Sequence, residues 1–112
     1  MKAGSVLLAR IQQADGRLKL RPVVVLSNMP PYADMLVCAI SSKLKHEVKG
    51  FDDIIDENAT DFKSSGLKAS SLIRLGLVAT IPRSAIAGEL GMISEERLLK
   101  LRDRFSQYVK TG

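Results

Sequence analysis

The sequence predicts a mainly β fold with a C-terminal α-helix: a small SH3-like antiparallel barrel of five to six strands, formed as one domain over residues 1–112. Three observations lead to this prediction. Short apolar runs rich in Val, Ile and Leu recur through the first 93 residues, as is typical of strands. Turn-forming residues separate these runs. The remaining segment carries apolar residues at helical spacing. Short antiparallel strands that curl into one sheet form a small barrel.

Six apolar runs are the candidate strands, and polar segments connect them. The expected strands cover residues 5–13, 18–27, 35–42, 51–56, 72–81 and 86–93, with loops at 43–50 and 59–68. Asp15-Gly16 is a dipeptide typical of a tight hairpin turn. Val23-Val24-Val25 is β-branched throughout, which favours a strand buried on both faces. Pro22 has no amide proton, so we expect it at a strand start or at a sheet edge.

The C-terminal segment has the features of a capped amphipathic helix. Ser94 is a favourable N-cap, and Glu95 and Glu96 would lie in the first turn near the positive end of the helix dipole. Ile93 and Leu98 have the spacing of a hydrophobic staple. The apolar stripe that we expect to pack on the core consists of Leu98, Leu101, Phe105 and Val109.

Composition excludes several classes of protein. Apolar residues make up 46% and charged residues 26%, a globular balance that excludes a disordered chain. The single cysteine, Cys38, excludes a disulfide framework and a cysteine-based zinc site, and we expect it to be a small buried hydrophobe. No apolar run approaches the roughly 20 residues that span a bilayer. We therefore expect a cytoplasmic protein without a membrane association.

Charge is unevenly distributed along the chain. The net charge is +5, but residues 51–70 carry five acidic and only two basic side chains. A basic surface attracts polyanions, so nucleic acid is a candidate ligand. Aromatic residues are 4% of the chain, too few for a base-stacking platform such as an RRM. We expect the acidic insert to be a solvated loop, with contact to a basic partner as the alternative.

Four segments carry a family resemblance through their order and spacing. Residues 20–28 combine Arg-Pro, an apolar strand and a polar stop, and residues 37–42 form a strand that ends in serine. Residues 70–81 form a strand with an internal arginine, and residues 90–96 place Leu-Gly and Ser-Glu before the final helix. Together these segments resemble the PemK/MazF family of toxin–antitoxin endoribonucleases, over nearly the whole chain.

The resemblance implies an mRNA-cleaving endoribonuclease that acts on single-stranded RNA without a metal or other cofactor. It further implies a homodimer and a cognate antitoxin protein that blocks the RNA groove. In this family the ribose 2′-OH attacks the adjacent phosphate and leaves a 2′,3′-cyclic phosphate. Position by position, the catalytic candidates are Arg21, Ser41 and Arg74. Nearby basic and hydroxyl side chains are the candidate RNA-binding residues: Lys19, Ser42, Lys43 and Ser70.

The chemistry of these residue types fits part of that reaction. A guanidinium group is planar, always charged and bidentate toward phosphate, so Arg21 and Arg74 suit stabilisation of a phosphorane. Arginine is a poor base because its pKa is far above neutrality. The one histidine, His46, is a candidate base, although its Lys-His-Glu setting favours a solvated loop. We expect Arg21 to be exposed, and Arg74 to face away from the side that buries its neighbours.

Two departures from the family pattern leave other functions open. Gly76 stands where some members have an acidic residue, and Ala79 stands where an arginine is usual. These losses motivate an alternative: a barrel of the same descent that binds nucleic acid or protein without cleaving it. A toxin that poisons a topoisomerase ranks last, because that branch depends on a C-terminal tryptophan and this chain contains none.

Overall fold

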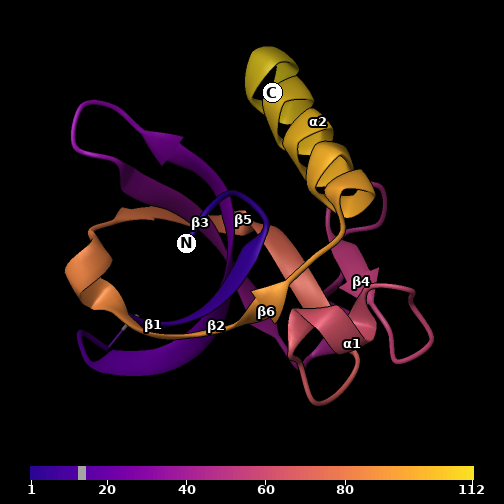
Figure 1. Cartoon of the computed structure of the whole chain (residues 1–112). Helices are drawn as coiled ribbons and strands as arrows, with labels where there is room; N and C mark the ends of the chain where they lie inside the picture. Colours follow the sequence, from indigo (N-terminus) through magenta and orange to yellow (C-terminus); the bar gives the residue numbers. More distant parts are fainter. Residues whose placement is uncertain (13–14) are drawn as a thin grey trace.

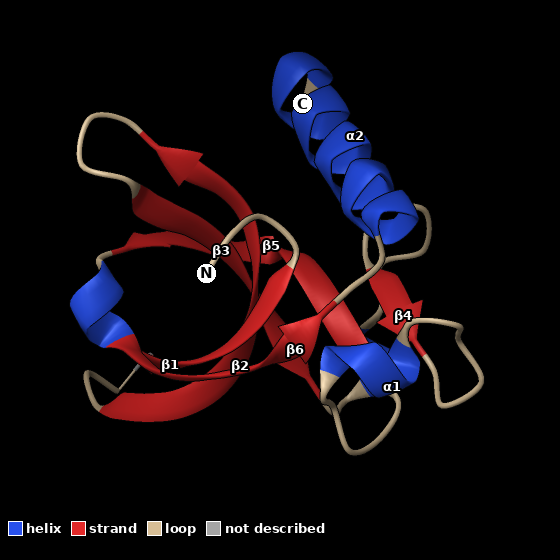
Figure 2. Cartoon of the chain, in the orientation of Figure 1, coloured by secondary structure: helices blue, strands red, loops and turns tan. Residues whose placement is uncertain are grey.

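The computed structural model describes residues 1–12 and 15–112. Within them, six strands pair into one antiparallel sheet in the order β4-β5-β3-β2-β1-β6 (Figures 1 and 2). The strands are β1 (Ser5–Gln12), β2 (Leu18–Met29), β3 (Asp34–Ser41), β4 (Asp53–Ile55), β5 (Ser71–Ile81) and β6 (Ile86–Met92). The helices are η1 (Leu44–His46), α1 (Phe62–Ser65), η2 (Arg83–Ala85) and α2 (Glu95–Thr111). The predicted mainly β fold with a C-terminal helix is confirmed.

The sheet curls into a barrel, and the short helix α1 bridges its two edge strands. β4 and β6 are the ends of the strand order, and α1 follows β4 in the chain and packs against β6 (Figure 1). The Ser64 hydroxyl donates a hydrogen bond to the Met92 carbonyl at 3.0 Å. We predicted only a loop at 59–68, and this was wrong because one turn of helix is too short to show a helical period.

The contact between α1 and β6 depends on a glycine. A Cβ at Gly91 would meet the backbone of Ser64 and Ser65 at less than van der Waals separation. We therefore expect Gly91→Ala to lower the free energy of unfolding by about 1–3 kcal/mol, measured by urea denaturation. Gly88→Ala is the matched control on the same strand, because a Cβ there would meet no atom within 4 Å. Equal stability of the two variants would contradict a close α1–β6 contact.

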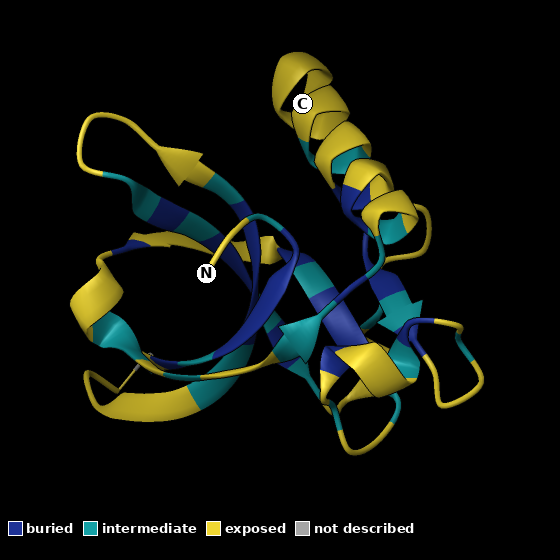
Figure 3. Ribbon diagram, in the orientation of Figure 1, coloured by how far each residue is buried: buried dark blue, intermediate teal, exposed yellow. Residues whose placement is uncertain are grey.

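The strands bury apolar side chains on both faces of the sheet (Figure 3). Val24 packs with the residues beneath α2, whereas Val23 and Val25 pack on the opposite face, as their β-branched run predicted. Cys38 is fully buried with Val24, which confirms it as a core residue. Burial raises the pKa of its thiol to about 12, so the sulfur stays protonated at neutral pH.

Pro22 lies inside β2, opposite Leu8 of β1, rather than at a strand start. On its other side, pairing with β3 begins only at Val23. The prediction of a sheet edge is therefore correct, since Pro22 occupies a stretch of β2 that only β1 pairs with. The expected strand 5–13 ends at Gln12, and residue 13 lies outside the described residues.

Helix α2 begins at the predicted cap and is buried only in its first half. The Arg97 amide donates to Ser94 Oγ at 3.1 Å, and Leu98 and Leu101 are buried against the sheet. Val109 was predicted to be core but is 66% exposed, because the helix extends beyond the sheet (Figures 1 and 3). Near its end, the ring of Tyr108 contacts that of Phe51, with centroids 4.7 Å apart.

The acidic insert is built into the core, which corrects the expected solvated loop. Asp52, Asp53 and Asp61 are all buried, whereas Asp56 is exposed as predicted. Arg97 donates from Nε and Nη2 to Asp61 at 2.8 and 3.0 Å, and from Nη1 to Asp53 at 2.6 Å. The prediction failed because the compensating guanidinium lies 36 residues after Asp61 in the sequence. This network joins β4 and the start of α1 to the first turn of α2.

Candidate functional site

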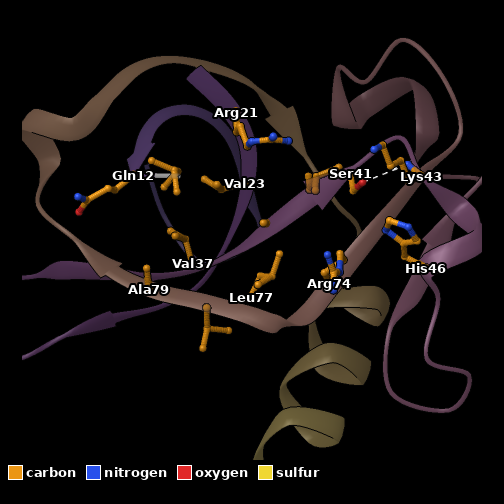
Figure 4. A pocket seen from close by; sticks show the side chains of 14 residues that line it. Gln12, Arg21, Val23, Val37, Ser41, Lys43, His46, Arg74, Leu77 and Ala79 are labelled. Atoms are coloured by element: carbon orange, nitrogen blue, oxygen red, sulfur yellow. Dashed lines mark hydrogen bonds between the residues drawn. The ribbon is translucent and has the colours of Figure 1, made fainter. Parts of the chain in front are cut away.

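A pocket of about 510 Å³ opens between β1, β2, β3 and β5 (Figure 4). Cationic side chains and Ser41 occupy one end, and mostly apolar side chains, together with Gln12, line the other. The lining residues are Ile11, Gln12, Arg21, Val23, Val37, Ala39, Ile40, Ser41, Lys43, His46, Arg74, Leu77, Val78 and Ala79. None of these fourteen is an aspartate or glutamate, so within the described chain the lining suits an anionic ligand.

The strand register explains how the three catalytic candidates meet. Ala39 of β3 pairs with Val23 of β2 on one side and with Arg74 of β5 on the other. Alternate residues of a strand share a face. Ser41, two residues after Ala39, and Arg21, two residues before Val23, therefore lie on the same face as this pair. Three adjacent strands therefore present Arg21, Ser41 and Arg74 to one pocket (Figure 4). The predicted orientation of Arg74 is also correct, because its neighbours on either side are buried on the opposite face.

A bulge in β5 shapes the pocket next to Arg74. Cys38 of β3 pairs with Val78, but the next residue, Ala39, pairs with Arg74. Residues 75–77 of β5 therefore have no opposite residue in β3 and form the bulge. The Leu75 amide within the bulge donates to Asp52 Oδ1 at 3.0 Å. The other oxygen of Asp52 accepts the Val48 amide at 2.9 Å. One buried carboxylate thus joins the bulge to the segment that follows β3.

The polar end holds four of the seven predicted site residues: Arg21, Ser41, Lys43 and Arg74. The Lys43 amide donates to Ser41 Oγ at 3.1 Å, which leaves the hydroxyl proton of Ser41 for donation to a ligand. Arg21 is half-buried rather than exposed, so the expectation of an exposed side chain was wrong. Its backbone pairs with Ala9 of β1, and its side chain lies in the lining of the pocket, which covers part of it.

The other predicted site residues lie outside the pocket. Lys19 and Ser42 are exposed and are absent from its lining. Ser70 accepts a hydrogen bond from the Glu57 amide at 3.0 Å, and so has a structural role at the end of a loop. RNA contact by these three residues stays a prediction.

Comparisons with known proteins identify the family. Residues 2–109 match the profile described as PemK-like, MazF-like toxin of type II toxin–antitoxin system. The chain belongs to this family. The Mycobacterium tuberculosis toxin MazF-mt6 has a similar fold, with a TM-score of 0.71 and 16% identity over 96% of this chain and 98% of that one. No match was found among curated proteins. None of the helices in residues 1–12 and 15–112 is long and apolar enough to cross a membrane.

The two departures from the PemK/MazF pattern lie at different places. Gly76 is exposed within the β5 bulge, whereas Ala79 lines the apolar end of the pocket. The site therefore has no acidic side chain at the position where some family members have one. Sequence reasoning gave little weight to His46, which is exposed as predicted but also lines the pocket (Figure 4). Its sequence neighbours concealed this, because charged flanks are typical of a solvated loop.

Proposed function

We propose that this PemK/MazF-family chain is a toxin-type endoribonuclease that cleaves single-stranded RNA in the pocket between β2, β3 and β5. One observation carries the proposal: Arg21, Ser41 and Arg74 come from three strands and line the same pocket. In the reaction the ribose 2′-OH attacks the adjacent phosphate, the P–O5′ bond breaks, and a 2′,3′-cyclic phosphate remains. The catalytic groups are protein side chains, and a metal is not required.

The cationic end suits the charge that develops at phosphorus. Arg21 and Arg74 are permanent cations with several N–H donors, and Lys43 adds a third positive charge beside them. Donors aimed at the oxygens of a phosphorane stabilise the transition state more than the ground state. The Ser41 hydroxyl supplies a further donor between the two arginines.

The apolar end suits unpaired nucleotides. Val23, Val37 and Leu77 line it, and their apolar surfaces are suited to the face of a base or to a ribose. A pocket of about 510 Å³ has the size of a small-ligand site, which separated nucleotides enter and a stacked duplex does not. Single-stranded RNA is therefore the substrate that both ends favour.

The proposal extends to the assembly and its control. We infer that the chain acts in the cytoplasm as a homodimer, as the family resemblance implies. A cognate antitoxin protein restrains it by covering the pocket. The homodimer and the antitoxin rest on the family resemblance. Measurement of the molecular size in solution, with and without the antitoxin, tests the dimer and its complex.

The decisive experiment compares two substrates in the presence of EDTA. We expect the purified chain to cut a mixed-sequence single-stranded RNA and to leave cyclic phosphate ends, detected by mass spectrometry. The same sequence with 2′-deoxyribose throughout should stay intact, because the attacking hydroxyl is missing. Cleavage of both strands, or cleavage only with added metal, would contradict the mechanism. Tight RNA binding without products would instead favour the non-catalytic barrel.

A further inference from the structure

We propose that His46 is the catalytic base of the RNA cleavage proposed above, and accepts the proton of the attacking 2′-OH. This inference rests on the proposed function and adds the group that the family resemblance left unassigned. His46 lines the same pocket as Arg21, Ser41 and Arg74, and its ring lies on the side of the pocket where Arg74 and Lys43 also point (Figure 4).

Among the side chains that line the pocket, His46 is the one whose chemistry suits a base. The guanidinium groups of Arg21 and Arg74 and the ammonium group of Lys43 have only N–H donors, so they stabilise an anion but accept no proton. The Gln12 amide is not a base, and no lining residue is a carboxylic acid. The neutral imidazole of a histidine has a free ring nitrogen, which can accept a proton from a hydroxyl group.

The segment that carries His46 is held in place by hydrogen bonds. Its 3₁₀ turn, η1, is closed by the His46 amide, which donates to the Lys43 carbonyl at 3.1 Å. Directly after it, the Val48 amide is bound by the buried Asp52, whose other oxygen accepts the Leu75 amide beside Arg74. Asp52 is thus a positioning residue that ties the histidine segment to the strand bearing Arg74.

The charged groups around the imidazole are all cationic on the pocket side. Lys43 comes from its own segment, Arg21 from β2 and Arg74 from β5. The adjacent Lys45 and Glu47 do not line the pocket. A phosphate bound by these three cations would therefore have the imidazole beside it as the only proton acceptor among the lining groups.

The proposed step balances in atoms and charge. The 2′-OH proton moves to a ring nitrogen of His46 as the O2′–P bond forms. The P–O5′ bond breaks, its electron pair stays on O5′, and that oxygen takes a proton from water at the open side of the pocket. The imidazolium then returns its proton to solvent, which restores the neutral ring for the next substrate.

The test is a single-turnover cleavage assay with His46→Ala and the neighbouring Lys45→Ala as matched control. We expect His46→Ala to be slower by about 10²–10⁴-fold, the usual contribution of general base catalysis, and to regain activity with added imidazole. The pH dependence of the rate should change in His46→Ala but persist in Arg21→Ala. Lys45→Ala should match the parent. An unchanged rate and pH profile in His46→Ala would overturn the proposal.

A second measurement follows the imidazole itself, since the chain contains only one histidine. We expect its NMR signals to shift when a 2′-O-methyl RNA binds, and His46→Ala to bind that RNA about as tightly as the parent. Unshifted signals in the bound state would also overturn the role of His46. If the parent cleaves no RNA, both the proposed endoribonuclease function and the role of His46 are refuted. If the parent cleaves RNA and His46→Ala is fully active, only the role of His46 as the base is refuted.

Discussion

Replacement of Arg74 by alanine is expected to slow RNA cleavage by about 10²–10³-fold while the chain stays folded. The guanidinium lines the polar end of the pocket, and its neighbours in β5 are buried on the other face of the sheet. Its removal therefore takes a donor from the transition state and leaves the core intact. Single-turnover rates and thermal unfolding, measured on the same preparation, give the two quantities separately.

Four further variants make this result specific. Arg74→Lys keeps the charge but loses the bidentate fork, so its rate should lie between those of Arg74→Ala and the parent. Arg83→Ala removes an exposed arginine outside the pocket and should leave the rate unchanged. Arg21→Ala should resemble Arg74→Ala, and the double variant should be less impaired than the product of the two effects, because both groups act on one phosphate. If Arg74→Ala cleaves RNA as fast as Arg83→Ala, Arg74 has no role in the reaction.

Local pattern was sufficient for several features that repeat over a few residues. Alternation placed Arg74 opposite Ile73 and Leu75, and the β-branched run predicted burial of β2 on both faces. The helix cap at Ser94 was equally local, because its partner is three residues away. The convergence of Arg21, Ser41 and Arg74 was not visible in any such pattern, and it was expected only from the family resemblance.

Features that depend on distant partners were missed. The burial of Asp52 follows from amides on two different segments, Val48 and Leu75, and no sequence spacing reveals that pairing. Asp52 in this way joins Val48, two residues after His46, to Leu75 in the bulge of β5. The sequence offered one weak signal, since an isolated glycine within a strand pattern, here Gly76, often marks a bulge.

These missed features connect the acidic insert to the proposed site. Asp52 holds the segment after β3 against the strand that carries Arg74, and the Arg104 guanidinium donates to the Asp52 carbonyl at 2.6 Å. The same insert is anchored to α2 through Asp53 and Asp61. The carboxylates that we expected to face solvent therefore support a pocket whose charged lining residues are cationic. Helix α2 contributes no lining residue, but it anchors the insert that supports the pocket.

Replacement of Arg97 by leucine is expected to lower the free energy of unfolding by about 3–5 kcal/mol at neutral pH. The Arg97 side chain is only 12% exposed and donates to both Asp61 and Asp53, so its loss leaves two buried carboxylates without their main partner. Lys100→Ala is the control, because Lys100 pairs with the same Asp53 from a side chain that is 44% exposed. Its effect should stay within about 1 kcal/mol. Similar losses in the two variants, measured by urea denaturation, would show that the buried network is not the source of stability.

The free energy of unfolding of Arg97→Leu should differ from that of the parent most at neutral pH and least in acid. Burial alone would raise the pKa of the Asp61 carboxyl, but the hydrogen bonds and charge of Arg97, together with the Ser94 amide, hold it below its ordinary value. A carboxylate whose pKa is lowered by folding contributes stability above its unfolded pKa of about 3.9, and that stability is lost as the pH falls through the folded pKa. In Arg97→Leu this contribution is absent, and protonation of the carboxyls relieves the cost of burying them. The gap between the two unfolding free energies should therefore narrow as the pH falls below about 4, toward the lowered folded pKa of Asp61. A gap that stays constant through this acid range would assign the loss to packing rather than to charge.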